Sequence, residues 1–188
     1  MIGYDFDDTI YYGDSTRDFI FYCLKRQPTL ARYAFRWGWN ALLWKVLHIK
    51  TKTQFKEQLY SFFRGIKDID AYVEDFWATH YKNIKGWYLE QKRDDDVIIS
   101  ASPEFLLRPA IDKLGIKYFM ASRVDKKTGK YEGENCWGEE KVRRFKEKMP
   151  EAEIESFYSD SRSDTPMARL ATGKSYLVKD DTLTLWDL

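Results

Sequence analysis

Short apolar runs alternate with helical patterns along most of this 188-residue chain, and this alternation constrains its fold more than any other feature. The apolar runs are residues 1–6, 97–100, 117–122, 154–159 and 175–179. Helical spacing covers residues 103–114, 139–148 and 164–171. Strands that alternate with helices pair in parallel, because each helix returns the chain to the starting edge of the sheet. The sequence therefore predicts an α/β fold with a parallel five-stranded sheet covered by helices on both faces.

One long stretch, residues 15–92, interrupts this alternation without a convincing strand. Helical spacing is clear in its segments TRDFIFYCLKR, TQFKEQLYSFFRGI and DIDAYVEDFWATHY. Asp14 or Ser15 suits the N-cap of the first. The stretch reads as a helical insertion after strand one. We therefore expect a core domain of residues 1–14 and 93–188 and a helical cap domain of residues 15–92.

Bulk composition narrows the class of protein. The chain has 31 Lys and Arg and 30 Asp and Glu, so its net charge is only +1. It therefore has no strong positive electrostatic field that would favour nucleic acid as a partner. Cys23 and Cys136 do not make a disulfide framework, and free thiols suit a reducing compartment. The first residues lack the pattern of a signal peptide. We expect a cytoplasmic protein that does not bind nucleic acid; its oligomeric state stays open.

Polar residues end three of the expected strands. Asp5 and Asp7 follow strand one, Ser100 ends strand two, and Asp160 and Asp164 follow strand four. The carboxyl ends of parallel strands meet at one crevice, so these side chains should converge. Carboxylates gathered there would repel one another by several kcal/mol at low effective dielectric. A divalent cation removes that repulsion, and an all-oxygen site suits Mg²⁺.

The order of these motifs resembles the haloacid dehalogenase-like superfamily. DFDDTI fits its first motif, VIISAS its second, Lys141 in GEEKVRR its third and FYSDSRSD its fourth, and together they cover essentially the whole chain. SASPEF, NCWGEEKVRR and SDSRSDTPMARLA are similar to subfamily IB, the branch of phosphoserine phosphatases and the bacterial phosphatidylglycerophosphatase C group. The resemblance implies a Rossmann-like core, and a C1 cap in the place of the helical insertion.

The resemblance also implies a phosphatase mechanism. Asp5 corresponds to the nucleophile that forms an aspartyl-phosphate, and Asp7 to the general acid and base. Mg²⁺ would be held by Asp5, Asp160 and the backbone carbonyl of Asp7, with Asp164 in the metal shell or orienting the lysine.

Phosphoryl oxygens would be held by Ser100, Ala101 and Lys141, again by resemblance. Thr9 should shape the turn after strand one. Because Asp7 is present, phosphoryl transfer is favoured over carbon–halogen cleavage.

Two departures bear on the substrate. Asp14 stands where phosphoserine phosphatases have a Glu, and Tyr60 where they have a cap Arg. The loss of a bidentate Arg disfavours phosphoserine. Asp14 and Tyr60 are the candidate specificity residues.

Trp37, Trp39 and Trp44 lie in an apolar stretch of the insertion, YAFRWGWNALLWKVLHI. The stretch is interpreted as a buried cap helix or as a surface that meets a membrane or a lipid-like phosphomonoester. Three functions stay open: a Mg²⁺-dependent phosphatase of a small metabolite, the same chemistry on a lipid or glycolipid phosphate, and a phospho-accepting or scaffold protein without turnover.

Several polar residues receive a structural interpretation instead. Asp8 reads as a turn or cap acid, and Asp94, Asp95 and Asp96 as a solvated turn. His48 and His80 have no partner at metal-ligand spacing, and Cys136 reads as structural.

Overall fold

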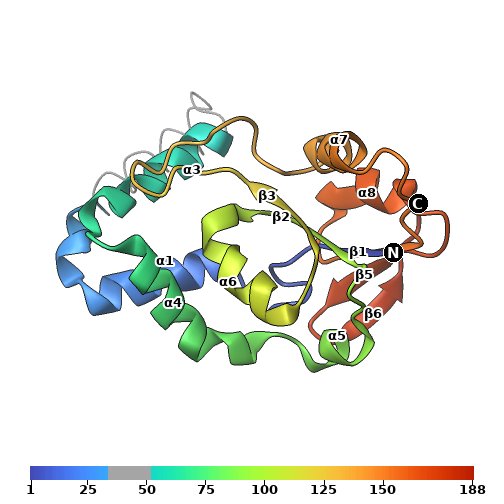
Figure 1. Ribbon diagram of the computed structural model, residues 1–188, viewed down its shortest axis with the longest axis horizontal. Helices are drawn as coiled ribbons and strands as arrows, with labels where there is room; N and C mark the ends of the chain where they lie inside the picture. Colours follow the sequence, from blue (N-terminus) through green and yellow to red (C-terminus); the bar gives the residue numbers. More distant parts are fainter. Residues whose placement is uncertain (34–51) are drawn as a thin grey trace.

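The computed structural model describes residues 1–33 and 52–188 and is built on one six-stranded sheet, in the order β3-β2-β1-β4-β5-β6 (Figure 1). The strands are β1 (Ile2–Tyr4), β2 (Val97–Pro103), β3 (Tyr118–Ser122), β4 (Ser156–Ser159), β5 (Tyr176–Lys179) and β6 (Thr182–Leu185). Neighbours are parallel from β3 to β5, which confirms the predicted α/β fold. The strand count was one short, because β6 pairs antiparallel with β5 through a tight turn that was not predicted.

Side chains of β2 alternate between two apolar clusters. Ile98 belongs to one, while Val97 and Ile99 belong to the other. The sheet is therefore buried on both faces, as expected for parallel strands between helices. One face is covered by α5 (Gly86–Gln91) and α6 (Glu104–Leu114), and the other by α7 (Glu139–Lys148) and α8 (Thr165–Leu170).

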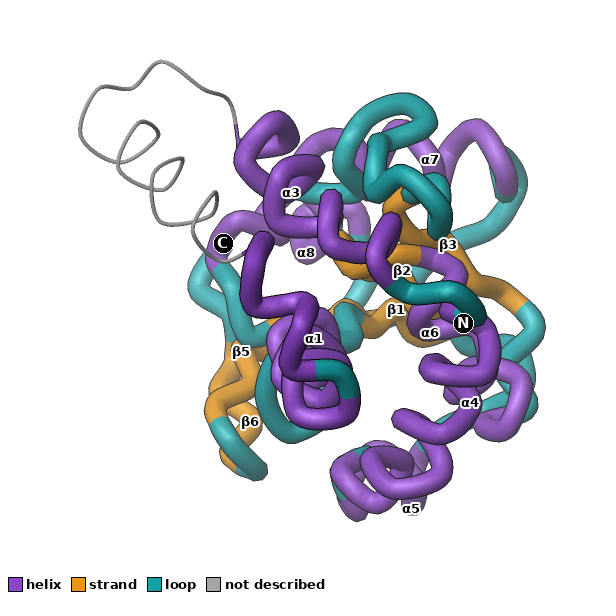
Figure 2. The backbone as a smooth tube through the Cα atoms, turned by 90° about the vertical axis from the view of Figure 1, so that its left-hand side faces the viewer, coloured by secondary structure: helices purple, strands orange, loops and turns teal. Residues whose placement is uncertain are grey.

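The described part of residues 15–92 is helical. Its main helices are α1 (Ser15–Arg26), α3 (Lys52–Tyr60) and α4 (Ile69–His80). Short 3-10 helices lie at Pro28–Tyr33, Ser61–Gly65 and Tyr81–Asn83. Asp14 caps α1, since its carboxylate accepts from the Arg17 N–H at 2.8 Å. Figures 1 and 2 show these helices at one end of the molecule, in front of the strands when viewed from that end. Trp37, Trp39, Trp44 and His48 lie outside the described residues.

Cap helices and core helices share one apolar cluster. Phe19 and Phe76 of the insertion belong to the same cluster as Leu106 and Leu107 of α6. The Trp77 indole of α4 donates to the carbonyl of Leu106 at 2.6 Å. The helical insertion is thus fastened to the sheet through α4 and α6.

The insertion leaves and re-enters the core at a single place. Tyr12 N–H donates to the Asn83 carbonyl at 2.9 Å, and Lys85 N–H donates to the Ile10 carbonyl at 2.8 Å. The two connecting segments are therefore hydrogen-bonded neighbours. Across the described ranges, no helix combines the length and the apolarity needed to cross a bilayer.

The acidic turn before β2 differs from its prediction at Asp96. This side chain is fully buried. Its carboxylate accepts from the Ile2 N–H at 3.0 Å and from the Arg93 N–H at 2.7 Å. Asp96 therefore fastens the start of β2 to the start of β1, and the prediction of a solvated residue was wrong there.

Candidate active site

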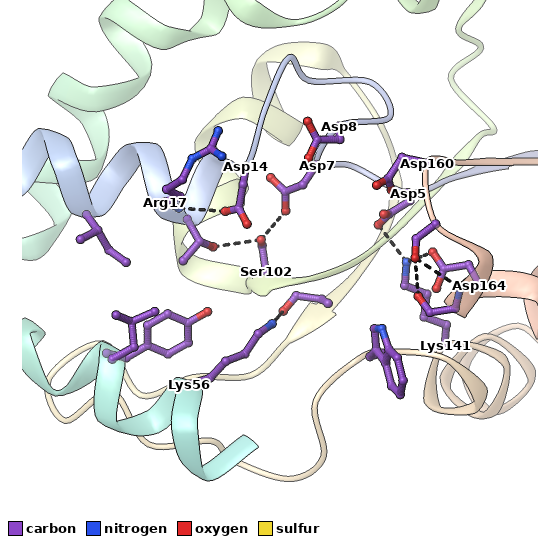
Figure 3. A pocket seen from close by; sticks show the side chains of 18 of the residues that line it. Asp5, Asp7, Asp8, Asp14, Arg17, Lys56, Ser102, Lys141, Asp160 and Asp164 are labelled. Carbon is purple, nitrogen blue, oxygen red and sulfur yellow. Dashed lines mark hydrogen bonds and ion pairs between the residues drawn. The ribbon is translucent and has the colours of Figure 1, made fainter. Parts of the chain in front are cut away.

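The carboxyl ends of β1, β2 and β4 meet because β1 lies between the other two strands. A cavity of about 540 Å³ opens at this edge, between the core and the cap helices (Figure 3). The core contributes mostly polar side chains, from Asp5, Asp7, Asp8, Ser102, Lys141, Asp160 and Asp164, and also Ala101. The insertion contributes Asp14, Thr16, Arg17, Ile20, Phe21, Leu24, Lys56, Leu59 and Tyr60. The structure thus brings most of the sequence-predicted residues to one cavity.

A buried lysine joins two of the carboxylates. Lys141, in the first turn of α7, donates through Nζ to Asp5 Oδ1 at 2.8 Å and to Asp164 Oδ2 at 2.6 Å. Burial alone would lower the pKa of Lys141, but the charges of Asp5 and Asp164 raise it well above its usual value. Burial raises the pKa of Asp5, and the Lys141 ammonium opposes that shift. The lysine is therefore charged in this site, and it compensates both acids.

Asp160 stands beside Asp5 and is fixed by Thr9. Its backbone N–H donates to Thr9 Oγ1 at 2.9 Å, and the Thr9 hydroxyl lies 3.5 Å from Asp160 Oδ1. Thr9 therefore joins the turn after β1 to the end of β4. Desolvation and the negative charges of Asp5 and Asp8 raise the pKa of Asp160 to about 7. The carboxylates at this end of the cavity thus repel one another when ionised.

A divalent cation between Asp5 and Asp160 would relieve that repulsion, so the donor set suits an oxygen-preferring ion. Asp164 is already paired with Lys141, although its Oδ1 is buried without a hydrogen-bond partner among the described residues. The Asp7 carboxylate is turned away toward Ser102 (Figure 3). In residues 1–33 and 52–188, no three His, Cys, Asp or Glu side chains are close enough to enclose an ion. Backbone carbonyls and water would have to complete the coordination.

Both oxygens of the Asp7 carboxylate are held. Oδ1 accepts from the backbone N–H of Ser15 at 2.7 Å, and Oδ2 accepts from the hydroxyl of Ser102. Burial and the charge of Asp14 raise the pKa of Asp7 to about 7, although the hydrogen bonds from Ser102 and Ser15 oppose the shift. A carboxyl group with this pKa can both give and take a proton near neutral pH.

The three residues Ser100, Ala101 and Ser102 in β2 differ in whether they line the cavity. Ser100 is fully buried, and its Oγ accepts from the Ser102 N–H at 3.1 Å, so it supports the turn behind the cavity. Ala101 does line the cavity, and its carbonyl accepts from Lys56 Nζ at 3.3 Å. Ser102, which the sequence analysis did not select, also lines the cavity and contacts Asp7 directly. The repeated serine in SAS was the available signal, because Ser102 lies two residues beyond Ser100.

The two predicted specificity residues, Asp14 and Tyr60, both line the cavity, and both side chains also make contacts within the protein. The carboxylate of Asp14 caps α1. Tyr60 is only 1% exposed, and its ring stacks with that of Tyr131. Lys56, one turn earlier on α3, brings a cation to the cavity that the sequence analysis also did not select.

Behind the site, a second buried lysine holds two turns together. Lys85 is 1% exposed, and its Nζ donates to the carbonyl of Asp8 at 2.7 Å and to that of Asp180 at 2.5 Å. Asp8 and Asp180 both have a φ of 52°, a left-handed conformation that is uncommon for residues other than glycine. Asp8 is thus the turn residue that the sequence predicted, and Lys85 ties its turn to the β5–β6 hairpin.

Comparison with known proteins agrees with this fold. The sequence model of the haloacid dehalogenase-like hydrolase family matches residues 2–169. Protein CicA of Caulobacter vibrioides (strain NA1000 / CB15N) is 25% identical over 198 residues, covering 95% of this chain and 86% of CicA. A probable phosphatase of Mycobacterium tuberculosis (strain ATCC 25618 / H37Rv) is 36% identical over 97 residues, covering 46% of this chain and 32% of that protein.

Two solved structures share the fold. A protein of unknown function from Bordetella pertussis Tohama I superimposes with a TM-score of 0.70 at 22% identity, covering 89% of this chain and 84% of that one. A phospho-aspartyl intermediate analogue of phosphoserine phosphatase superimposes with a TM-score of 0.57 at 18% identity, covering 94% and 84%. The family match spans most of the residues and all four motifs that form the cavity. The chain therefore belongs to the haloacid dehalogenase-like hydrolase family.

Proposed function

We propose that this protein is a Mg²⁺-dependent phosphatase that hydrolyses a phosphomonoester through an aspartyl-phosphate on Asp5. The observation that carries the proposal is the buried Lys141 bridge between Asp5 and Asp164, with Asp7 beside it at the same sheet edge. A carboxylate fixed by a cation is ready for in-line attack on phosphorus.

In the first step an Asp5 oxygen bonds to phosphorus and the ester P–O bond breaks, while Asp7 gives its proton to the leaving oxygen. In the second step water attacks phosphorus and Asp7 takes a proton from it. The bond between phosphorus and Asp5 then breaks, and inorganic phosphate leaves. Lys141 and the backbone N–H groups around Ala101 stabilise charge on the phosphoryl oxygens.

Asp5, Asp160 and the carbonyl of Asp7 would hold Mg²⁺, and Asp164 would orient Lys141. The bound ion supplies positive charge that offsets the carboxylates and the phosphoryl oxygens. Burial and the negative charges of Asp5 and Asp8 raise the pKa of Asp160, and a bound cation would offset that charge, which supports this assignment.

The substrate we propose is a small phosphorylated metabolite, selected by cap residues 15–92, with Asp14 and Tyr60 contributing to the shape of the site. A lipid or glycolipid phosphate is the second candidate. The apolar wall that the cap adds to the cavity supports it: Ile20, Phe21 and Leu24 of α1 face the site with Leu59 of α3. Phe21 is 62% exposed, so apolar surface is available next to the cavity.

A panel of phosphomonoesters assayed with Mg²⁺ tests both candidates, with lipid phosphates presented in detergent. Phosphate release that stops with excess chelator and returns with Mg²⁺ is the expected result. Ca²⁺ should inhibit, because its looser and larger coordination shell spoils the in-line geometry. Full activity in excess chelator, or no release from any compound, would overturn the proposal.

A further inference from the structure

We propose that Ser102 and Thr16 form a hydroxyl bridge that positions Asp7 for proton transfer and couples it to the first cap helix. This inference rests on the proposed phosphatase function. Ser102 lies near the end of the core strand β2, whereas Thr16 lies in the first turn of α1. Both side chains are almost fully buried, at 5% and 8% exposed.

The bridge has a defined direction of donation. The single hydroxyl hydrogen of Ser102 is donated to Asp7 Oδ2. The hydroxyls of Ser102 and Thr16 are 3.0 Å apart, so Thr16 is the donor of that second hydrogen bond while Asp7 is ionised. The order is therefore Thr16 to Ser102 to Asp7.

The backbone around Asp7 assigns different roles to its two oxygens. Oδ1 accepts from the backbone N–H of Ser15 at 2.7 Å, and that N–H cannot accept a proton in return. We infer that Oδ2 is the oxygen that exchanges a proton with the leaving group or with water, because Oδ1 is held by the backbone at the start of α1. Ser102 contacts that same oxygen, and thereby sets where the acid group stands relative to the ester oxygen.

The cap takes part in this arrangement through α1. Ser15, whose N–H holds Asp7 Oδ1, and Thr16, whose hydroxyl contacts Ser102, both belong to its first turn. Asp7 thus has its full set of hydrogen bonds only while the start of α1 is docked on β2. Displacement of a reacting group by about 1 Å can cost on the order of 10²-fold in rate, so this docking matters for catalysis.

Leaving-group dependence tests the positioning role. An alkyl phosphate needs a proton on its leaving oxygen, while p-nitrophenyl phosphate releases a stable phenolate that does not. For Ser102→Ala we expect kcat/KM for the alkyl phosphate to fall about 10- to 100-fold. For p-nitrophenyl phosphate it should fall by less than about 3-fold, because the protein still binds the phosphoryl group.

Matched variants separate position from structure. Thr16→Val should show the same bias to a smaller degree, while Ser102→Thr and Thr16→Ser, which keep the hydroxyls, should retain activity. In an Asp7→Asn background Ser102→Ala should cause no further loss, since the bridge acts only through Asp7. Ser61→Ala removes a cap hydroxyl that bonds the carbonyl of Gln58 and serves as the unrelated control.

Equal losses on the two substrates, or full additivity with Asp7→Asn, would overturn the inference and leave Ser102 a purely structural residue. If Ser102→Ala fails to fold in a thermal melt, the two Thr16 variants decide by the same criterion. Lack of activity in the wild-type protein with Mg²⁺ on every phosphomonoester would instead overturn the proposed function itself.

Discussion

Lys141 and Asp164 form an ion pair with an Nζ–Oδ2 distance of 2.6 Å, although each residue is only 1% exposed. Removing one partner of a buried pair leaves an uncompensated charge. Lys141→Met should therefore reduce the free energy of unfolding by about 3–5 kcal/mol and abolish turnover. Urea denaturation measures the first effect. Asp164→Asn is the control: it leaves Lys141 paired with Asp5 and should cost less. An unchanged urea midpoint for Lys141→Met would contradict the buried-pair assignment.

Asp5→Asn should abolish phosphate release while the protein still folds. The amide keeps the size of the side chain but cannot form the acyl phosphate. Steady-state assays should show less than a few percent of wild-type kcat, and circular dichroism should be unchanged. Residual activity above that level would exclude Asp5 as the nucleophile. Asp18→Asn, in the first turn of α1, provides a matched change of charge at a residue that does not line this cavity.

The stability of the metal-free protein should fall as pH rises through the range from about 4 to 7. Asp7 and Asp160 have an ordinary pKa of 3.8, which the fold raises to about 7. Within this range the folded protein keeps protons that the unfolded chain has released. The free energy of unfolding therefore falls as pH increases.

Thermal melts in chelator across this pH range test the prediction. Mg²⁺ should raise the melting temperature more at about pH 8 than at about pH 5, because it binds the ionised carboxylates. Asp160→Asn should flatten both the pH dependence and the Mg²⁺ effect. A stability that rises steadily with pH in chelator would show that these two groups do not dominate.

Lys85→Met should destabilise the protein and lower activity without touching the cavity residues Asp5 and Asp7. It leaves the carbonyls of Asp8 and Asp180 without their shared donor, and a typical intramolecular hydrogen bond contributes about 0.5–1.5 kcal/mol to stability. Both the melting temperature and kcat should fall, because the turn after β1 loses its anchor. Lys179→Met, an exposed lysine in the neighbouring hairpin strand, should leave both values nearly unchanged.

Asp14 should reveal two separable roles. Asp14→Asn keeps the N-cap of α1 and removes the charge, whereas Asp14→Ala loses both and should cost about 1 kcal/mol more in stability. If Asp14 helps select the substrate, Asn should change kcat/KM unevenly across the phosphomonoester panel. A uniform change across the panel would assign Asp14 to helix capping alone.

The ends of the strands could be predicted because their signals are local. The apolar runs place Asp5 and Asp160 directly after the correct strands and Ser100 within β2, which extends three residues beyond its predicted end, and α7 begins and ends where its pattern predicts. The residues that were missed depend on partners far away in the chain. Ser102 meets Thr16 across 86 positions and Lys85 meets Asp180 across 95. Nothing in the neighbouring sequence marks either contact, so only the folded chain reveals them.

β6 was missed for a different reason. Its four residues are all exposed and alternate Thr with Leu, so they bury little and give a weak strand signal. The prediction for Asp96 was wrong because acidic runs usually lie in solvent. Here the Asp96 carboxylate instead accepts hydrogen bonds from two backbone N–H groups. At both β6 and Asp96, the structure depends on hydrogen bonds with backbone groups of other segments.

The apolar cluster shared by α1, α4 and α6 has a consequence for cooperativity. Phe19, Phe76 and Leu106 are fully buried, and they belong to one contiguous cluster although they come from both sides of the insertion boundary. Exposing that cluster by detaching the cap would cost the hydrophobic free energy of both parts at once. We therefore expect the insertion to be a separate segment of sequence but not a separate folding unit, so that cap and core melt in a single transition.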